Sequence, residues 1–158
     1  MPGVRGAGAF PAVSLPELSG RERSIAQAWG SGRALVLIGH ASCATTRQTL
    51  PYVDRIHRRR GRGHGVVAVL QDAEEAAAEL KRDLKLELPL LLERDPYPLA
   101  RALGLVTVPT LFLVGPDGAI ARFSEAWSRA ALEGFAEDLG VAGPLLDPDD
   151  PMPALKPG

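Results

Sequence analysis

Residues 34–56 read ALVLIGHASCATTRQTLPYVDRI, and this stretch decides how the chain folds. It opens with a continuous apolar run, residues 34–38, which is typical of a strand covered on both faces. Beyond the run, apolar residues recur at intervals of three and predict an amphipathic helix over residues 44–60. Cys43, the one cysteine of the chain, therefore lies between a buried strand and the start of a helix.

Apolar runs and amphipathic stretches continue to alternate along the rest of the chain. The turn GPDG at residues 115–118 places Pro and Asp-Gly between two apolar runs, which predicts a hairpin. The order βαβα followed by ββα favours an α/β fold with a mixed central β-sheet flanked by helices. Further strands are expected at residues 66–70, 88–92, 110–114 and 119–123, and further helices at residues 73–84, 95–103 and 129–139.

The chain has 158 residues, a length typical of one domain with short tails. We place that domain at residues 10–142. Residues 1–9 are rich in Gly and Ala and are expected to be disordered. Residues 143–158 are dense in Pro and Asp and have no apolar period, so we interpret them as a disordered or loosely docked tail.

Composition and charge exclude several classes of function. A formal net charge of −1 argues against a dedicated nucleic-acid-binding protein. No apolar run approaches the roughly 18 residues of a membrane-spanning helix, so we expect no membrane partner. Residues 1–10 lack the apolar block of a secretory signal, so we expect a cytoplasmic protein. A single cysteine excludes an internal disulfide and a multi-thiolate metal cage, and we expect neither a metal nor another cofactor.

We interpret the basic residues within 55–62 as a solvated helix end.

The position of Cys43 is compatible with a reactive thiol. At the first turn of a helix, unpaired backbone N–H groups and the positive end of the helix dipole stabilise a thiolate. Thiols in such places have pKa values lowered from about 8.5 to roughly 3.5–7.5. The position is equally compatible with a small core residue, because free cysteines are among the most buried residue types.

Residues 34–56 resemble the strand, cysteine motif and helix of the thioredoxin-like superfamily, in particular its TlpA-like and redoxin (AhpC/TSA, peroxiredoxin-like) branch. In that pattern a Cys-x-x-Cys pair is followed by a basic or polar residue and then by a proline that kinks the helix. Cys43 takes the place of the first cysteine and Thr46 that of the second. Arg47 takes the place of the following residue and Pro51 that of the proline.

Segments on both sides of this motif carry the same resemblance. Residues 10–33 are similar to the N-terminal hairpin of the redoxin branch. Residues 104–113, GLVTVPTLFL, resemble the family's cis-proline segment, and residues 115–123 resemble the hairpin that follows it. The resemblance covers about residues 10–139 and implies a thioredoxin-like fold with an N-terminal β-hairpin extension.

The resemblance also implies roles for individual residues. Cys43 is the expected nucleophile, and Val108 and Pro109, joined by a cis peptide bond, are the expected platform for the substrate backbone. The chain departs from the family pattern at Thr46, because a hydroxyl cannot attack a mixed disulfide as the second thiol of a dithiol enzyme does. The Thr46 hydroxyl can instead donate a hydrogen bond to the Cys43 thiolate.

Three functions remain open from the sequence. The first is a monothiol oxidoreductase, in which Cys43 exchanges with protein or small-molecule disulfides and an external thiol resolves the product. The second is a one-cysteine peroxidase, in which peroxide oxidises the sulfur to a sulfenic acid. The third is a binding module without catalytic activity. The natural substrate, the reductant and the oligomeric state are left open.

The peroxidase hypothesis depends on residues around the sulfur. Peroxiredoxins carry a Pro-x-x-x-Thr-x-x-Cys motif. In this chain Val36 stands at the Pro position of that motif and His40 at its Thr position. His40 could still bond the peroxide or the sulfur. A peroxidase also needs an arginine near the sulfur, for which Arg47, Arg101 and Arg122 are candidates. We therefore take His40 and Arg47 as auxiliary site residues.

Overall fold

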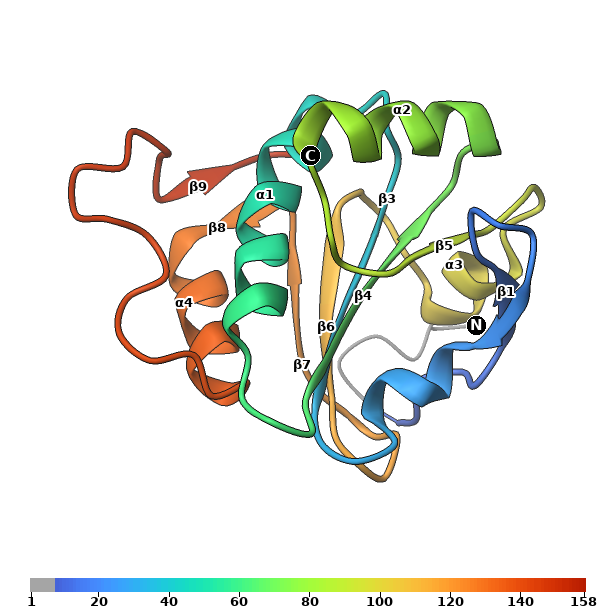
Figure 1. Cartoon of the computed structure of the whole chain (residues 1–158), viewed down its shortest axis with the longest axis horizontal. Helices are drawn as coiled ribbons and strands as arrows, with labels where there is room; N and C mark the ends of the chain where they lie inside the picture. Colours follow the sequence, from blue (N-terminus) through green and yellow to red (C-terminus); the bar gives the residue numbers. More distant parts are fainter. Residues whose placement is uncertain (1–7) are drawn as a thin grey trace.

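The centre of the molecule is a five-stranded mixed sheet (Figure 1). Its strands are β3 (Ala34–Gly39), β4 (Gly65–Leu70), β5 (Leu90–Leu92), β6 (Thr110–Val114) and β7 (Ile120–Glu125). They are arranged in the order β5-β4-β3-β6-β7. Strands β3, β4 and β5 run parallel, whereas β6 is antiparallel to β3 and to β7. The computed structural model, which describes residues 8–158, thus confirms the expected mixed α/β architecture.

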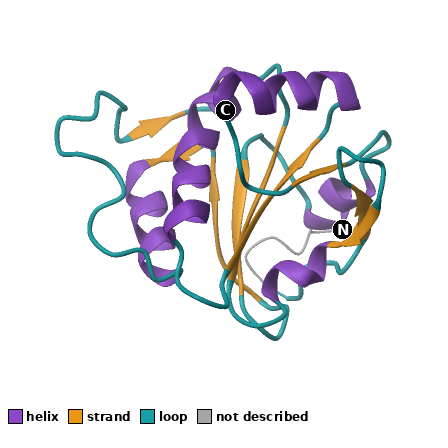
Figure 2. Ribbon diagram, in the orientation of Figure 1, coloured by secondary structure: helices purple, strands orange, loops and turns teal. Residues whose placement is uncertain are grey.

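Helices cover both faces of this sheet (Figure 2). One face carries α1 (Ala44–Arg59), α2 (Glu74–Leu84) and α4 (Arg129–Asp138). The other face carries α3 (Pro98–Leu103), the 3-10 helix η1 (Ile25–Trp29) and an N-terminal hairpin formed by β1 (Ser14–Pro16) and β2 (Glu22–Ser24). Two short strands, β8 (Trp127–Ser128) and β9 (Leu155–Lys156), pair separately beside α4.

Strand β3 is the central strand of the sheet, and it is buried along its whole length. Successive side chains of a strand point to opposite faces of its sheet. Accordingly, Leu35 and Leu37 pack with the apolar residues of α1 and α4, whereas Val36 and Ile38 pack with the hairpin, η1 and α3. A strand with two covered faces needs apolar residues at every position, which is why its sequence shows no alternation.

Helix α1 is fixed to the segment that follows α2 by a buried carboxylate, Asp54. The backbone N–H groups of Glu87 and Leu88 each donate to Asp54 Oδ1 at 2.8 Å. The Nε atom of Arg58 donates to Asp54 Oδ2 at 2.7 Å. This places the C-terminal half of α1 against the entry to β5.

Two expected elements begin two or three residues later in the structure. Helix α3 begins at Pro98 and not at residue 95, because Tyr97 has a φ of 57° and cannot continue a right-handed helix. Strand β5 begins at Leu90 and not at residue 88, because the N–H of Leu88 is taken by Asp54 and Pro89 has no N–H to donate.

The two terminal segments were expected to be disordered or loosely docked. Residues 1–7 lie outside the described residues, while Ala9 forms a β-bridge with Ala119. Residues 143–158 lie against α1, α4 and β8, and Leu145 and Leu146 are buried in the core. The prolines of this segment do not prevent docking, because its carbonyl groups and Asp150 accept hydrogen bonds from side chains of the domain.

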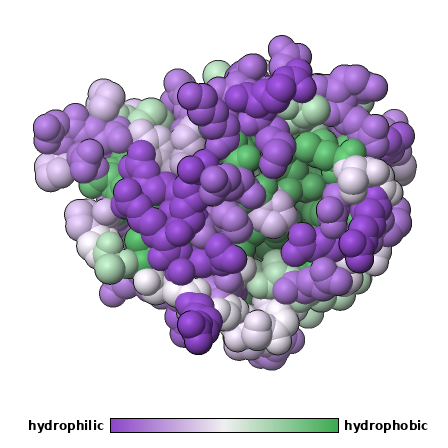
Figure 3. Space-filling model, in the orientation of Figure 1, coloured by the Kyte–Doolittle hydropathy of each residue, from purple (hydrophilic) through white to green (hydrophobic). Residues whose placement is uncertain are grey.

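Hydrophilic side chains cover most of the face over α1 and α2, and apolar surface shows between α2 and the N-terminal hairpin (Figure 3). This agrees with the amphipathic character of both helices, whose buried apolar residues belong to the core on this face of the sheet. Among the helices of residues 8–158, none combines the length and apolar character of a membrane span.

Candidate active site

Cys43 lies at the point where the chain leaves β3 and enters α1. It is the N-cap residue of α1, with an extended backbone conformation (φ −86°, ψ 119°). Its own N–H donates to the carbonyl oxygen of His40 at 3.1 Å, and its sulfur accepts from the N–H of Thr46 at 3.5 Å. A sulfur atom therefore takes the capping role that Ser, Thr, Asp or Asn usually fills, and the side chain is partly exposed.

The pKa of the Cys43 thiol is lowered from its ordinary value. Burial works in the opposite direction and raises it, since a thiolate is better solvated by water. That effect is outweighed by the nearby Thr46 hydroxyl, by hydrogen bonds from the backbone N–H groups of Thr46 and Thr45, and by the positive charge of Lys156. The site thus favours the nucleophilic form of the sulfur.

Thr46 places a side-chain hydroxyl near the sulfur, in addition to the N–H groups of the helix start. Its side chain is fully buried, and its hydroxyl has no hydrogen-bond partner at normal distance within residues 8–158. It packs over Gly39, where an added Cβ would lie 2.7 Å from the hydroxyl oxygen. A buried hydroxyl without a partner is costly, and formation of a thiolate at Cys43 would satisfy it.

Substitution of Thr46 by Val should therefore raise the pKa of Cys43. We expect alkylation of Cys43 by iodoacetamide to slow roughly three- to tenfold at neutral pH, since a hydrogen bond to a charged group is lost. The two rates should converge at high pH, where both proteins are fully thiolate. Thr49→Val is the matched control, because the buried Thr49 hydroxyl donates to the Thr45 carbonyl oxygen at 2.7 Å and does not serve the sulfur. Equal pH profiles for Thr46→Val and wild type would contradict this role.

Tertiary structure brings the Val108–Pro109 segment to the sulfur. The peptide bond between these residues is cis. The Sγ atom of Cys43, as a thiol, donates to the carbonyl oxygen of Val108 at 3.6 Å, across 65 positions of sequence. The hydroxyl of Thr107 approaches the same oxygen at 3.5 Å. Cys43, Thr46, Val108 and Pro109 therefore lie together at one site.

The two auxiliary candidates are placed differently. The ring of His40 contacts the Ser42 hydroxyl, with 2.8 Å between Nδ1 and Oγ, and His40 also lines a pocket beside Val108. Arg47 lies on α1, but its guanidinium group faces α2, where it is 3.4 Å from Asp83 Oδ2. It also donates to the carbonyl oxygen of Ala41 at 3.5 Å. His40 thus belongs to the site region, whereas Arg47 supports the loop that precedes Cys43.

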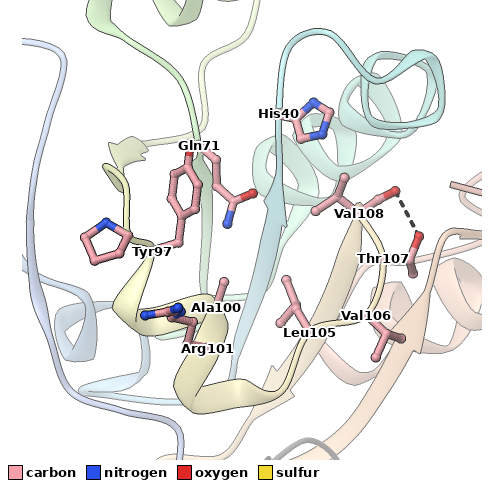
Figure 4. Close-up of a pocket in the computed structure, with 10 residues that line it drawn as sticks. His40, Gln71, Tyr97, Ala100, Arg101, Leu105, Val106, Thr107 and Val108 are labelled. Carbon is pink, nitrogen blue, oxygen red and sulfur yellow. Dashed lines mark hydrogen bonds between the residues drawn. The ribbon is translucent and has the colours of Figure 1, made fainter.

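The pocket beside Val108 has a volume of about 320 Å³. Figure 4 shows His40 and Val108 at one end, and Gln71 beside the ring of Tyr97 at the other. Arg101 of α3 also lines it. A pocket of this size accepts a small molecule next to the carbonyl group that contacts the sulfur.

Several site residues were missed from the sequence. The carboxylate of Asp72 accepts from the N–H of Ala41 at 2.9 Å and so holds the loop before Cys43. Thr45 and Gln48, in the first turns of α1, bind residues of the C-terminal segment. An ordinary turn aspartate or an exposed helix residue carries no local signal of such a partner, so only the packing shows it.

No three side chains of His, Cys, Asp or Glu in residues 8–158 are placed to hold a metal ion. The chemistry of the site as described rests on the Cys43 sulfur and the donors around it.

Solved structures of several other proteins resemble this fold. The structure resembles a thiol:disulfide interchange protein from a Bacteroides species (TM-score 0.75, 20% identity, covering 88% of this chain and 93% of that one). It also resembles a thiol-disulfide oxidoreductase from Bacteroides fragilis (TM-score 0.73, 19% identity, 84% and 99% covered). A third similar structure is the peroxidoxin BcpB from Mycobacterium tuberculosis (TM-score 0.70, 14% identity, 84% and 94% covered). At these identities the likeness shows the thioredoxin-like fold alone.

Sequence comparison places the chain in a family. No curated protein matches it. The model of the AhpC/TSA family, however, matches residues 7–123, which include the Cys43 motif, the Val108–Pro109 segment and β7 up to Phe123. The chain belongs to the AhpC/TSA family and has a thioredoxin-like fold.

Proposed function

We propose that this protein is a thiol oxidoreductase that works with Cys43 as its single nucleophile. The proposal rests on the surroundings of the Cys43 sulfur. The sulfur caps α1 and accepts a hydrogen bond from the backbone N–H of Thr46. The pKa of its thiol is lowered, and the sulfur lies 3.6 Å from the Val108 carbonyl oxygen. A structural core cysteine would be enclosed by apolar side chains, whereas Cys43 is partly exposed. Membership of the AhpC/TSA family and the likeness to a thiol:disulfide interchange protein and a peroxidoxin support thiol chemistry.

The proposed cycle has two exchange steps. In the first, the Cys43 thiolate attacks one sulfur of a disulfide, forms a mixed disulfide and expels the other sulfur as a thiolate, which takes a proton from water. In the second, an external thiolate attacks the substrate sulfur that is bonded to Cys43, forms a new disulfide with it and so releases the Cys43 thiolate. The chain holds no second cysteine, so the second step needs a thiol from outside. The electrons pass from that external thiol to the original disulfide.

A peroxidase is the second candidate, favoured by the pocket that His40 and Arg101 line beside Val108. Peroxide would transfer one oxygen to the Cys43 thiolate and give a sulfenic acid and water or an alcohol. The two other arginines that the sequence offered are paired elsewhere, Arg47 with Asp83 and Arg122 with Asp138. This leaves Arg101 as the arginine of the three that lines the pocket.

The proposal is tested by capture of a mixed disulfide. After incubation with oxidised glutathione, the wild-type protein should gain the mass of one glutathione, and Cys43→Ser should gain none. Reduced glutathione should then restore the original mass, and repeated cycles should give turnover with a small disulfide such as hydroxyethyl disulfide.

Two results would contradict the oxidoreductase proposal. The first is the absence of any mixed disulfide in the wild-type protein together with a Cys43 alkylation midpoint near 8.5, as in a free thiol; this would favour the binding module. The second is rapid formation of a sulfenic acid with hydrogen peroxide and no exchange with disulfides, which would favour the peroxidase.

A further inference from the structure

The segment 143–158, which we call the strap, turns back after α4 and returns to the first turn of α1 (Figure 1). Its first part is built into the domain. The carboxylate of Glu133 accepts from the N–H groups of Leu145 and Leu146 at 2.6 and 3.1 Å, and both leucines are buried. The strap therefore begins from a fixed point on α4.

Its middle part is held by side chains of the domain. The Tyr52 hydroxyl donates to Asp150 Oδ2 at 2.8 Å, and the Arg129 guanidinium group donates to the Asp150 carbonyl oxygen at 2.8 Å. The indole N–H of Trp127 donates to the carbonyl oxygen of Pro153 at 2.6 Å. These bonds leave residues 154–158 little freedom in where they lie.

The last residues of the strap lie on the first turns of α1. Strand β9 pairs with β8 in antiparallel register, in the way that a bound extended peptide adds a strand to an exposed edge. The Thr45 hydroxyl donates to the carbonyl oxygen of Pro157 at 2.6 Å, and the Lys156 ammonium group donates to the side-chain oxygen of Gln48. An extended polypeptide is thus already seated on the helix that Cys43 caps.

Residue 158 fills the space beside Val108. A Cβ atom added to Gly158 would collide with the carbonyl oxygen of Val108 and with the Thr107 hydroxyl. The same carbonyl oxygen is the one that lies 3.6 Å from the Cys43 sulfur. The strap and the nucleophile therefore meet at one backbone group.

We propose that the strap excludes other polypeptides from this face of Cys43 while small thiols and disulfides still reach the sulfur. A second extended chain on the Val108 backbone would meet the end of the strap, which occupies the space at Val108 and binds the Thr45 hydroxyl. Cys43 nevertheless stays partly exposed, and the pocket beside Val108 contains no residue of the strap. The inference builds on the proposed oxidoreductase function and names its substrate class, small-molecule disulfides and thiols.

The test compares two reagents with the same reactive group and different size. Cys43 is alkylated with N-ethylmaleimide and with a maleimide on a long polyethylene glycol chain, in wild type and in a variant that lacks residues 154–158. The ratio of the two rates cancels any change in thiolate fraction caused by the loss of Lys156. If the strap is open in about a tenth of the molecules, its removal should raise the relative rate of the large reagent roughly tenfold.

A second pair of variants displaces the end of the strap without removing it. Gly158→Ala should push the end of the strap away from Val108, because its Cβ would collide with the Val108 carbonyl oxygen, and should therefore raise the relative rate of the large reagent. Leu155→Ala is the control, since the Leu155 side chain is 73% exposed. It should leave the rate ratio unchanged.

An unchanged rate ratio in a folded deletion variant would overturn the proposal. If the deletion variant fails to fold, equal rate ratios in Gly158→Ala and Leu155→Ala would overturn it instead. Neither readout requires turnover. A protein that shows the size effect but forms no mixed disulfide would therefore refute the oxidoreductase function and leave the strap in place.

Discussion

Replacement of Thr46 by Cys should convert the single-sulfur site into one that closes its own disulfide. The backbone nitrogen of Thr46 already lies 3.5 Å from the Cys43 sulfur, and the Thr46 hydroxyl is close enough to lower the pKa of the Cys43 thiol. A Cys-x-x-Cys pair at a helix start is the arrangement of dithiol oxidoreductases. We expect Cys43 and the introduced cysteine to form a disulfide completely under mild oxidation, measured as the loss of both free thiols from a monomer of unchanged mobility.

The same variant should lose its dependence on an external thiol for release of the first product. In wild type a mixed disulfide with glutathione should persist until another thiol arrives, whereas in Thr46→Cys it should decay on its own as the second sulfur attacks. Thr45→Cys is the matched control, because the Thr45 side chain faces Pro157 and not the sulfur. If Thr46→Cys retains two free thiols under oxidation, Thr46 is not the structural counterpart of a resolving cysteine.

Substitution of Asp54 by Ala should give the largest loss of stability. The Asp54 carboxylate is the acceptor for the N–H groups of Glu87 and Leu88, and Leu88 is fully buried. Removal of the acceptor leaves these donors unpaired at roughly 1–3 kcal/mol each. Arg58 loses its 2.7 Å partner as well. We expect the free energy of unfolding to fall by about 3 kcal/mol, measured by urea denaturation.

The control for this prediction is Glu87→Gln. The Glu87 carboxylate lies 3.6 Å from Arg58, and both side chains are largely exposed, at 62% and 43%. An exposed ion pair contributes little, so the free energy of unfolding should change by less than about 0.5 kcal/mol. A loss of similar size in both variants would show that Asp54 acts through its charge on Arg58 and not through the two backbone donors.

The positions of the elements could be predicted from the sequence because they depend on local patterns. The apolar run of β3, the spacing of apolar residues in α1 and the turn at residues 115–118 each depend only on neighbours along the chain. The position of Cys43 between a strand and a helix follows from the same neighbouring residues. The wrong start of α3 also has a local cause. The left-handed conformation of Tyr97 delays the helix, and the spacing of apolar residues does not reveal it.

Contacts between distant segments could not be predicted in this way. The approach of Val108 to Cys43 was expected only through family resemblance, because 65 positions separate them. Arg47 turned out to face Asp83, since a long side chain takes the partner that packing brings near. For the same reason the Pro- and Asp-rich strap looked loose in sequence.

The sequence alone therefore determined the order of strands and helices and the placement of one sulfur at a helix start, because hydrophobic periodicity and capping act over a few residues. Tertiary structure decided what surrounds that sulfur. The Val108 carbonyl group, the buried Thr46 hydroxyl over Gly39 and the end of the strap on Thr45 meet there only because β3, β6 and β8 set their distances. Each of these contacts depends on the three-dimensional arrangement of separate elements, which no single stretch of sequence encodes.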